Sequence, residues 1–222
     1  MAILKWDQTG ERFYETGVSK GVLYVVDDKG AYGAGVAWNG LTAVTKSPSG
    51  AEATPFYAND IKYLNLMTTE EFGATIEAYT YPKEFRACNG SAELAPGIYV
   101  GQQKRKTFGM CFRTVIGNDV DGSEHGYKLH FIYGALAAPS EEAFQTINDS
   151  IEPNTFSWEI TTTPVVINKP GFKPTATIEV DSTTCDAEKL AALEAVIYGT
   201  EEKEPTLPLP EDILTIIGVV QE

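Results

Sequence analysis

A short acidic segment holds the closest approach in this sequence to a metal-binding motif. Asp119, Asp121 and Ser123 have the i, i+2, i+4 spacing with which a calcium loop places its oxygen ligands. However, Glu124 stands where the sharp turn of such a loop needs glycine, and His130 stands where a bidentate glutamate belongs. We therefore predict no metal site and interpret the segment as a loop between two strands.

His125 and His130 are the only histidines, so a catalytic triad would need one of them. No GxSxG nucleophile elbow accompanies either, and the sequence has no HExxH pair, no GxGxxG and no GxxxxGK[ST] phosphate loop. These observations predict no catalytic residues, no cofactor-binding residues, no cofactor, and hence no enzyme. A hydrolase that uses Asp119 or Asp121 with a histidine is the remaining enzymatic alternative.

Cys88, Cys111 and Cys185 are odd in number, widely separated and in no CxxC pair. This spacing predicts buried or half-buried free thiols, and neither a disulfide framework nor a zinc site.

Two further groups of side chains suggest binding. The basic cluster from Gln103 to Lys106 suits either a phosphate or, as we favour, acidic residues across a subunit interface. Trp6, Trp38 and Trp158 suit either a sugar-binding face or, as we favour, core and subunit contacts.

The composition excludes several function classes. The formal net charge of −14 predicts a surface that repels nucleic acid and anionic lipid. That charge fits ordinary solubility, or an acidic wall past which a polyanion slides. No stretch approaches the roughly 20 apolar residues that span a bilayer, and the first residues do not resemble a signal peptide. We expect a protein that is made and kept in the cytosol, with no membrane partner.

Short β-forming runs between turn residues predict a mainly β, antiparallel fold. The predicted strands are 22–26, 36–38, 41–45, 72–81, 106–116, 127–136, 155–162 and 175–180, with a long hairpin formed by 106–116 and 127–136. One or two helical turns are expected at 82–88.

The connecting segments are predicted to be extended. Residues 1–20 are expected to form an N-terminal arm, and residues 46–71 a long irregular loop with exposed aromatics. One amphipathic helix is predicted over 186–198, with its apolar face on a sheet. Residues 201–222 are expected to form an extended C-terminal extension whose apolar part, 213–220, docks on this subunit or a neighbour.

The chain resembles the major tail proteins, also called tail-tube proteins, of long-tailed phages and prophages of Gram-positive bacteria. The resemblance covers nearly the whole chain but contains no catalytic motif, so its specificity lies in the number and order of the matching stretches. These are 12–18, 35–44, 47–52, 57–66, 71–82 and 172–177.

The resemblance implies one domain, 1–200, built as a β-sandwich or half-barrel with a flanking helix. It also implies stacked, hexameric rings that form a hollow tail tube in the virion, through which DNA passes without specific binding. The implied partners are further copies of the chain, a tape-measure protein and a tail terminator.

We expect the arms and the long loop to make the contacts between rings. The candidate interface residues are Trp6, Phe13, Tyr14, Pro48, Pro55, Phe56, Tyr57, Ile213 and Ile216. Two alternatives stay open: another β-rich tail connector or terminator that forms a single ring, and a soluble carbohydrate-binding β-sandwich.

Overall fold

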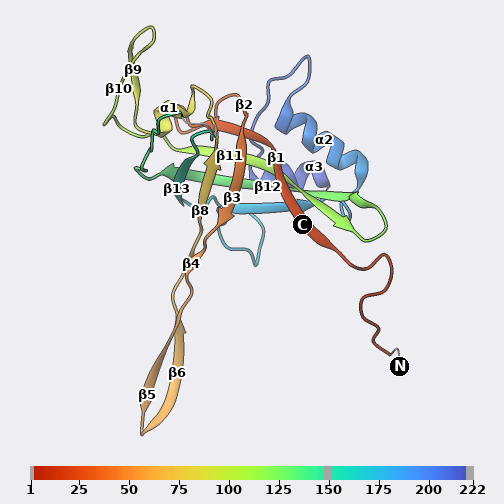
Figure 1. The fold of residues 1–222 in the computed structure, drawn as a ribbon. Helices are drawn as coiled ribbons and strands as arrows, with labels where there is room; N and C mark the ends of the chain where they lie inside the picture. The colour runs from red at the N-terminus through yellow and green to blue at the C-terminus, as the bar shows by residue number, and fades with distance from the viewer. Residues whose placement is uncertain (1–2, 148–151, 219–222) are drawn as a thin grey trace.

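The computed structural model describes residues 3–147 and 152–218, and it is mainly β with antiparallel pairing throughout (Figure 1). The main sheet runs in the order β2 (Val36–Trp38), β1 (Tyr14–Val25), β11 (Phe108–Asn118), β12 (Gly122–Ala137), β13 (Phe156–Thr162), β8 (Gly73–Ala78) and β3 (Leu41–Lys46). An eighth strand, β14 (Thr177–Asp181), pairs with β12 beside β13. Because β1 also contacts β3, the sheet curls into a half-barrel. The predicted fold class is therefore confirmed.

The remaining elements lie outside this sheet. Three short pairs are β4 (Ser49–Gly50) with β7 (Glu70–Glu71), β5 (Ala53–Ala58) with β6 (Ile61–Met67), and β9 (Ala92–Ala95) with β10 (Ile98–Val100). The helices of the described residues are α1 (Phe85–Cys88), α2 (Ala187–Tyr198) and α3 (Pro210–Ile217).

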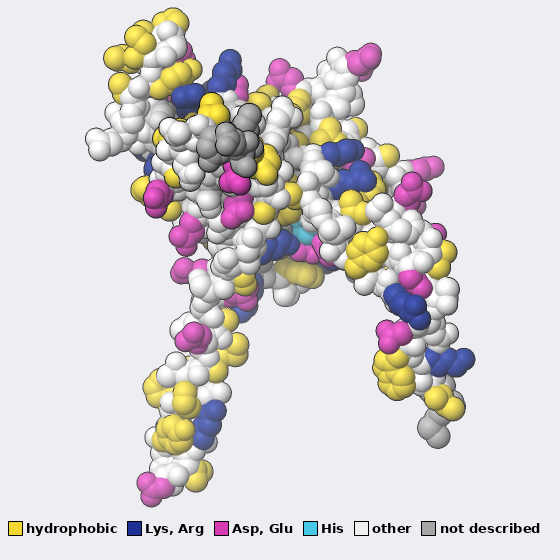
Figure 2. Space-filling view, in the orientation of Figure 1, with side chains coloured by type: hydrophobic (Ala, Val, Ile, Leu, Met, Phe, Trp, Pro, Cys, Tyr) yellow, Lys and Arg dark blue, Asp and Glu magenta, His cyan; other side chains and the backbone are white. Residues whose placement is uncertain are grey.

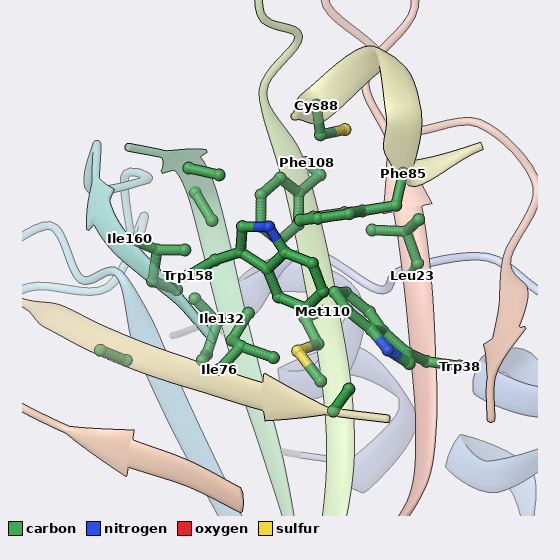
Figure 3. Close-up of a cluster of buried hydrophobic side chains, with 14 of the residues drawn as sticks. Leu23, Trp38, Ile76, Phe85, Cys88, Phe108, Met110, Ile132, Trp158 and Ile160 are labelled. Atoms are coloured by element: carbon green, nitrogen blue, oxygen red, sulfur yellow. The ribbon is translucent and has the colours of Figure 1, made fainter. Parts of the chain in front are cut away.

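An aromatic core fills the inside of the half-barrel (Figure 3). The Phe85 ring from α1 lies 4.6 Å from Trp38 and 4.9 Å from Trp158, between ring centroids, in tilted and edge-on arrangements. Such pairs contribute about 0.5–1.5 kcal/mol each beyond the burial of their area. The indole of Trp38 also donates a hydrogen bond to the carbonyl of Thr80 at 3.0 Å. The helix predicted at 82–88 is therefore present as α1, and it places Phe85 in the aromatic core.

A second core lies on the opposite face of β1, β11 and β12, under α2 and α3. Side chains alternate between the two faces, so Met110 enters the barrel core and Cys111 enters the helix-covered core. Tyrosines bridge the layers: the Tyr24 hydroxyl donates to the Ile197 carbonyl at 2.7 Å and the Tyr133 hydroxyl to the Pro208 carbonyl at 2.9 Å. The central strands are consequently buried on both faces.

Several predictions of elements are confirmed. The long hairpin exists as β11 and β12, although these strands continue through the predicted loop and leave only residues 119–121 between them. The predicted helix is α2, which begins after Asp186, whose side chain accepts hydrogen bonds from two backbone amides of the first turn. The predicted strand 72–81 is β8, in which Ala74, Ile76 and Ala78 share one face and are buried.

The prediction of an irregular loop over residues 46–71 was wrong. These residues form a hairpin that projects from the half-barrel (Figure 1). We call residues 49–71 the projecting hairpin. Asn59 and Asp60 join its long strands with positive φ angles of 51° and 62°, as a two-residue type I′ turn requires. The arm is also shorter than the predicted 1–20, because β1 already begins at Tyr14.

The segment after α2 differs from the extended tail that we expected. Leu207 and Pro208 are buried against the sheet, and the helix α3 follows them. Pro210, at the first position of α3, suits a helix start because its missing N–H would have no partner there. Two helices rather than one therefore cover the sheet, and part of the predicted apolar segment 213–220 lies outside the described residues.

Candidate self-assembly surfaces

The projecting hairpin exposes large apolar side chains that its own subunit leaves uncovered. Every residue of β5 and β6 is exposed, and Tyr57 and Tyr63 keep 70% and 69% of their surface accessible. Figure 2 shows hydrophobic side chains gathered along this hairpin. A lone two-stranded hairpin is marginally stable in water, so an apolar one of this length indicates a surface that packs against another molecule.

Both faces of the projecting hairpin carry apolar groups. Phe56 pairs with Leu64 and Thr54 with Leu66, and because side chains alternate along a strand these pairs share one face. The pair Ala53 and Met67 lies on the other face. A partner that covered one face only would therefore leave the apolar groups of the other face in water.

The N-terminal arm, residues 3–13, also extends away from the body, on the same side as the projecting hairpin in Figure 1. The side chain of Trp6 is 76% exposed. The arm is held at its base by Asp119, whose Oδ1 accepts hydrogen bonds from the amides of Gly10 at 3.0 Å and Arg12 at 3.4 Å. Asp119, considered above as a calcium ligand, therefore anchors the arm.

A polar network around the buried side chain of His130 lies where the arm and the projecting hairpin leave the sheet. Lys46, the last residue of β3, donates to His130 Nδ1 at 3.0 Å and also contacts Glu179. On the other side of the ring, His130 Nε2 lies 2.8 Å from the Thr114 hydroxyl, which donates to Glu15 at 2.8 Å. Since Nδ1 accepts from a lysine, the neutral ring carries its proton on Nε2.

The electrostatics of this network favour that neutral histidine. Burial, and then the Lys46 cation, lowers the pKa of His130. A hydrogen bond from Lys128 lowers the pKa of Glu15. Burial by itself would raise the pKa of Glu179, but contact with Lys46 outweighs it and the pKa is lowered. The network thus holds two carboxylates and two ammonium groups around one uncharged ring.

The nine candidate interface residues divide into three groups. Trp6 and Phe13 lie in the arm and Tyr14 begins β1 directly after it, and all three are exposed. Pro48 directly precedes the projecting hairpin, which contains Pro55, Phe56 and Tyr57, and these four are also exposed. Ile213 is 4% exposed and packs in the helix-covered core, so the structure places it inside its own subunit. Ile216 is half-buried at the edge of that core.

Sequence reasoning missed a third projection, the hairpin of β9 and β10. It exposes Leu94 and Ile98, and the Arg86 guanidinium lies 4.0 Å from the ring centroid of Tyr99 at its base. The turn signal Pro96-Gly97 between two short apolar runs would have indicated it.

The residues considered for chemistry are dispersed over the molecule. His125, in β12, pairs with Asp121 of the β11–β12 turn at 3.1 Å, whereas His130 lies inside the polar network. Within the described ranges there is no cluster of three or more acidic, histidine or cysteine side chains that could hold a metal ion. Burial raises the pKa of Cys88 to about 12, which keeps this thiol protonated and unreactive at neutral pH.

The basic cluster and two of the tryptophans, which were considered for binding, have contacts within their own subunit. Lys106 forms an ion pair with Asp28 at 3.0 Å, and Arg105 donates to the Ala137 carbonyl at 3.2 Å. Trp38 and Trp158 are buried in the barrel core, which removes two of the three tryptophans from any sugar-binding face.

Across the described residues, the search for a helix with the length and apolarity to cross a membrane finds none. Comparison with known proteins gives no match to a family profile and no match among curated proteins. Among solved structures, one match is a chain of the anti-feeding prophage baseplate, determined by cryo-electron microscopy with 6-fold symmetrisation. The two chains are 8% identical with a TM-score of 0.37, over 80% of this chain and 97% of that chain.

Proposed function

We propose that this protein is a structural subunit of a phage virion, which polymerises as stacked rings to form the tail tube. The observation that carries the proposal is the pair of apolar projections, the projecting hairpin and the N-terminal arm, on one side of a well-packed half-barrel. Soluble monomers rarely expose contiguous apolar surfaces of this kind, whereas subunits of polymers need them.

The rigid body and the exposed projections have separate roles in this proposal. The two buried cores give each subunit a stable wall segment without help from neighbours. The projecting hairpin, apolar on both faces, inserts between subunits of the adjacent ring and gains the burial that it lacks alone. Ring closure then satisfies strand edges that a monomer leaves open.

The charge supports a conduit for DNA. With 31 acidic and 17 basic residues, a hollow tube of this protein repels the phosphate backbone, so DNA slides past without binding. The resemblance to tail-tube proteins gives the ring order, six, and the further partners, a tape-measure protein and a tail terminator. Assembly then takes place in the host cytoplasm.

Negative-stain electron microscopy of the purified protein, alone and with tail-initiation components, tests the proposal. Hollow filaments with a regular axial repeat are the expected result. Single closed rings would instead indicate a terminator. Monomers under both conditions would overturn the proposal and favour a binding module.

A sharper test removes the projecting hairpin alone. Residues 49–71 are replaced by Asn-Gly, which preserves the β3–β8 pairing because Lys46 is already opposite Ala74. The expected product is a folded monomer that forms no filaments. As a matched control, Asp60→Asn keeps the turn and all apolar side chains, and it should form filaments like the unmodified protein.

A further inference from the structure

A groove lies at the end of β1 that is remote from the N-terminal arm. Its volume is 980 Å³, and Val26, Tyr32, Val165, Leu209 and Ile216 contribute apolar parts of its lining. Asp212 of α3 is the one charged residue among the lining residues that the structure describes. The groove therefore suits an apolar segment that carries a single positive charge.

The arm has the matching chemistry. Ile3, Leu4 and Trp6 are exposed apolar side chains, and Lys5 between them carries a positive charge. A tryptophan in an apolar groove buries a large area, and a lysine beside it can reach the Asp212 carboxylate.

The arm cannot reach the groove of its own subunit. The arm leaves the sheet at Tyr14, and the groove begins at Val26, beyond the other end of the 12-residue strand β1. At about 3.3 Å per residue this strand separates the two by about 40 Å. Asp119 pins the arm at Gly10, and the four residues from there to Trp6 span at most about 14 Å.

We propose that the arm of one copy docks in this groove of a second copy. Because the arm and the groove lie at opposite ends of β1, the contact is head-to-tail, and its repetition gives a closed ring or a filament. The inference rests on the proposed self-assembly, and it assigns a donor segment and an acceptor site that the projecting hairpin does not provide.

Cross-linking of two partners, each with one accessible introduced cysteine, tests this contact. Both proteins carry Cys185→Ser, because Cys185 is half-buried while Cys88 and Cys111 are buried. One partner carries Gln8→Cys in the arm, and the other carries Thr215→Cys in the groove. A short bismaleimide is added to the mixture, and mixed dimers are counted by mass spectrometry.

The control partner carries Glu124→Cys, which is exposed at the opposite end of the sheet. The groove pair should give about tenfold more mixed dimer than the control pair, because a docked arm holds the two thiols at high effective concentration. Adding Trp6→Ser to the arm partner should reduce the groove yield to the control level. The exposed arm packs in neither core, so this variant keeps the fold.

The outcomes separate the two proposals. Equal yields from the groove and control pairs overturn the docking, even if the unmodified protein forms tubes. A groove-specific dimer supports the docking, and if rings and tubes are nevertheless absent from micrographs, only the tail-tube proposal fails.

Discussion

The ammonium group of Lys46 lies 3.0 Å from Nδ1 of His130, a ring that is 3% exposed. Lys46 ends β3 at the base of the projecting hairpin, and the other ring nitrogen connects through Thr114 to Glu15, near the base of the arm. The buried side chain of His130 thus connects the base of the projecting hairpin with the strand that follows the N-terminal arm.

Replacing His130 with alanine should lower the free energy of unfolding by about 1–3 kcal/mol. The truncation removes two hydrogen bonds of the buried ring, to Lys46 and to Thr114, and each such bond contributes about 0.5–1.5 kcal/mol net. Chemical denaturation measures the change. His125→Ala, at a half-buried position of β12 beside the turn, is the matched control and should have the smaller effect. Equal effects of the two substitutions would contradict the role of the network.

Acidification should destabilise the protein through the same histidine. The pKa of His130 is lowered in the folded state relative to its ordinary value of 6.5, so the unfolded chain binds the proton more readily. The contribution of His130 to stability is therefore fully present above pH 6.5, the ordinary pKa of histidine, and it declines as the pH falls below 6.5. The pKa values of Glu15 and Glu179 are also lowered, so their contributions decline only below their ordinary value of 4.5.

Thermal unfolding at about pH 7.5 and about pH 5.5 measures this dependence. His130→Gln, which does not titrate, should show a smaller drop in Tm between the two conditions than the unmodified protein. An identical drop in both would show that His130 is not the group responsible.

Polar substitutions on the projecting hairpin should block assembly and leave the fold intact. Phe56→Ser with Leu64→Ser removes an apolar cross-strand pair that makes no core contact. We expect the Tm to stay within experimental scatter and filaments to disappear from micrographs. A large fall in Tm would mean that the hairpin packs within the subunit.

The segment after α2 should behave as part of the folded domain. Leu207 is 5% exposed, so Leu207→Ala should cost about 2–5 kcal/mol by leaving a cavity. Two residues later, Leu209 is 43% exposed, and Leu209→Ala should change the stability by less than about 0.5 kcal/mol. Denaturant unfolding of both variants decides between a docked segment and a loose extension, for which the two costs would be equal.

Releasing the base of the arm should make it sensitive to proteases. Asp119→Ala removes the acceptor for the amides of Gly10 and Arg12 and the ion pair to the Arg12 side chain. Limited trypsin digestion should cut after Arg12 faster in this variant, because local opening of the backbone precedes cleavage. Val120→Ala, in the same turn, is the control; an unchanged rate in Asp119→Ala would contradict the anchoring.

The sequence by itself determined the local structure of this protein. Alternation of apolar and polar residues defines β8 and the β11–β12 hairpin, and a capping aspartate defines the start of α2. These patterns are local, because the period of a strand or helix depends only on neighbouring residues. The mainly β fold class followed from them.

The tertiary structure decided what the projections and the polar residues do. In the segment 46–71, Pro48 and Pro55 argued against regular strands. The structure nevertheless has a hairpin there, which the turn residues Asn59 and Asp60 would have indicated. The sequence left open whether Ile213 docks on its own subunit or on a neighbour, and no pattern joined Lys46 and Glu15 through His130. Those contacts join residues far apart in the chain, and only the curled order of the strands brings them together.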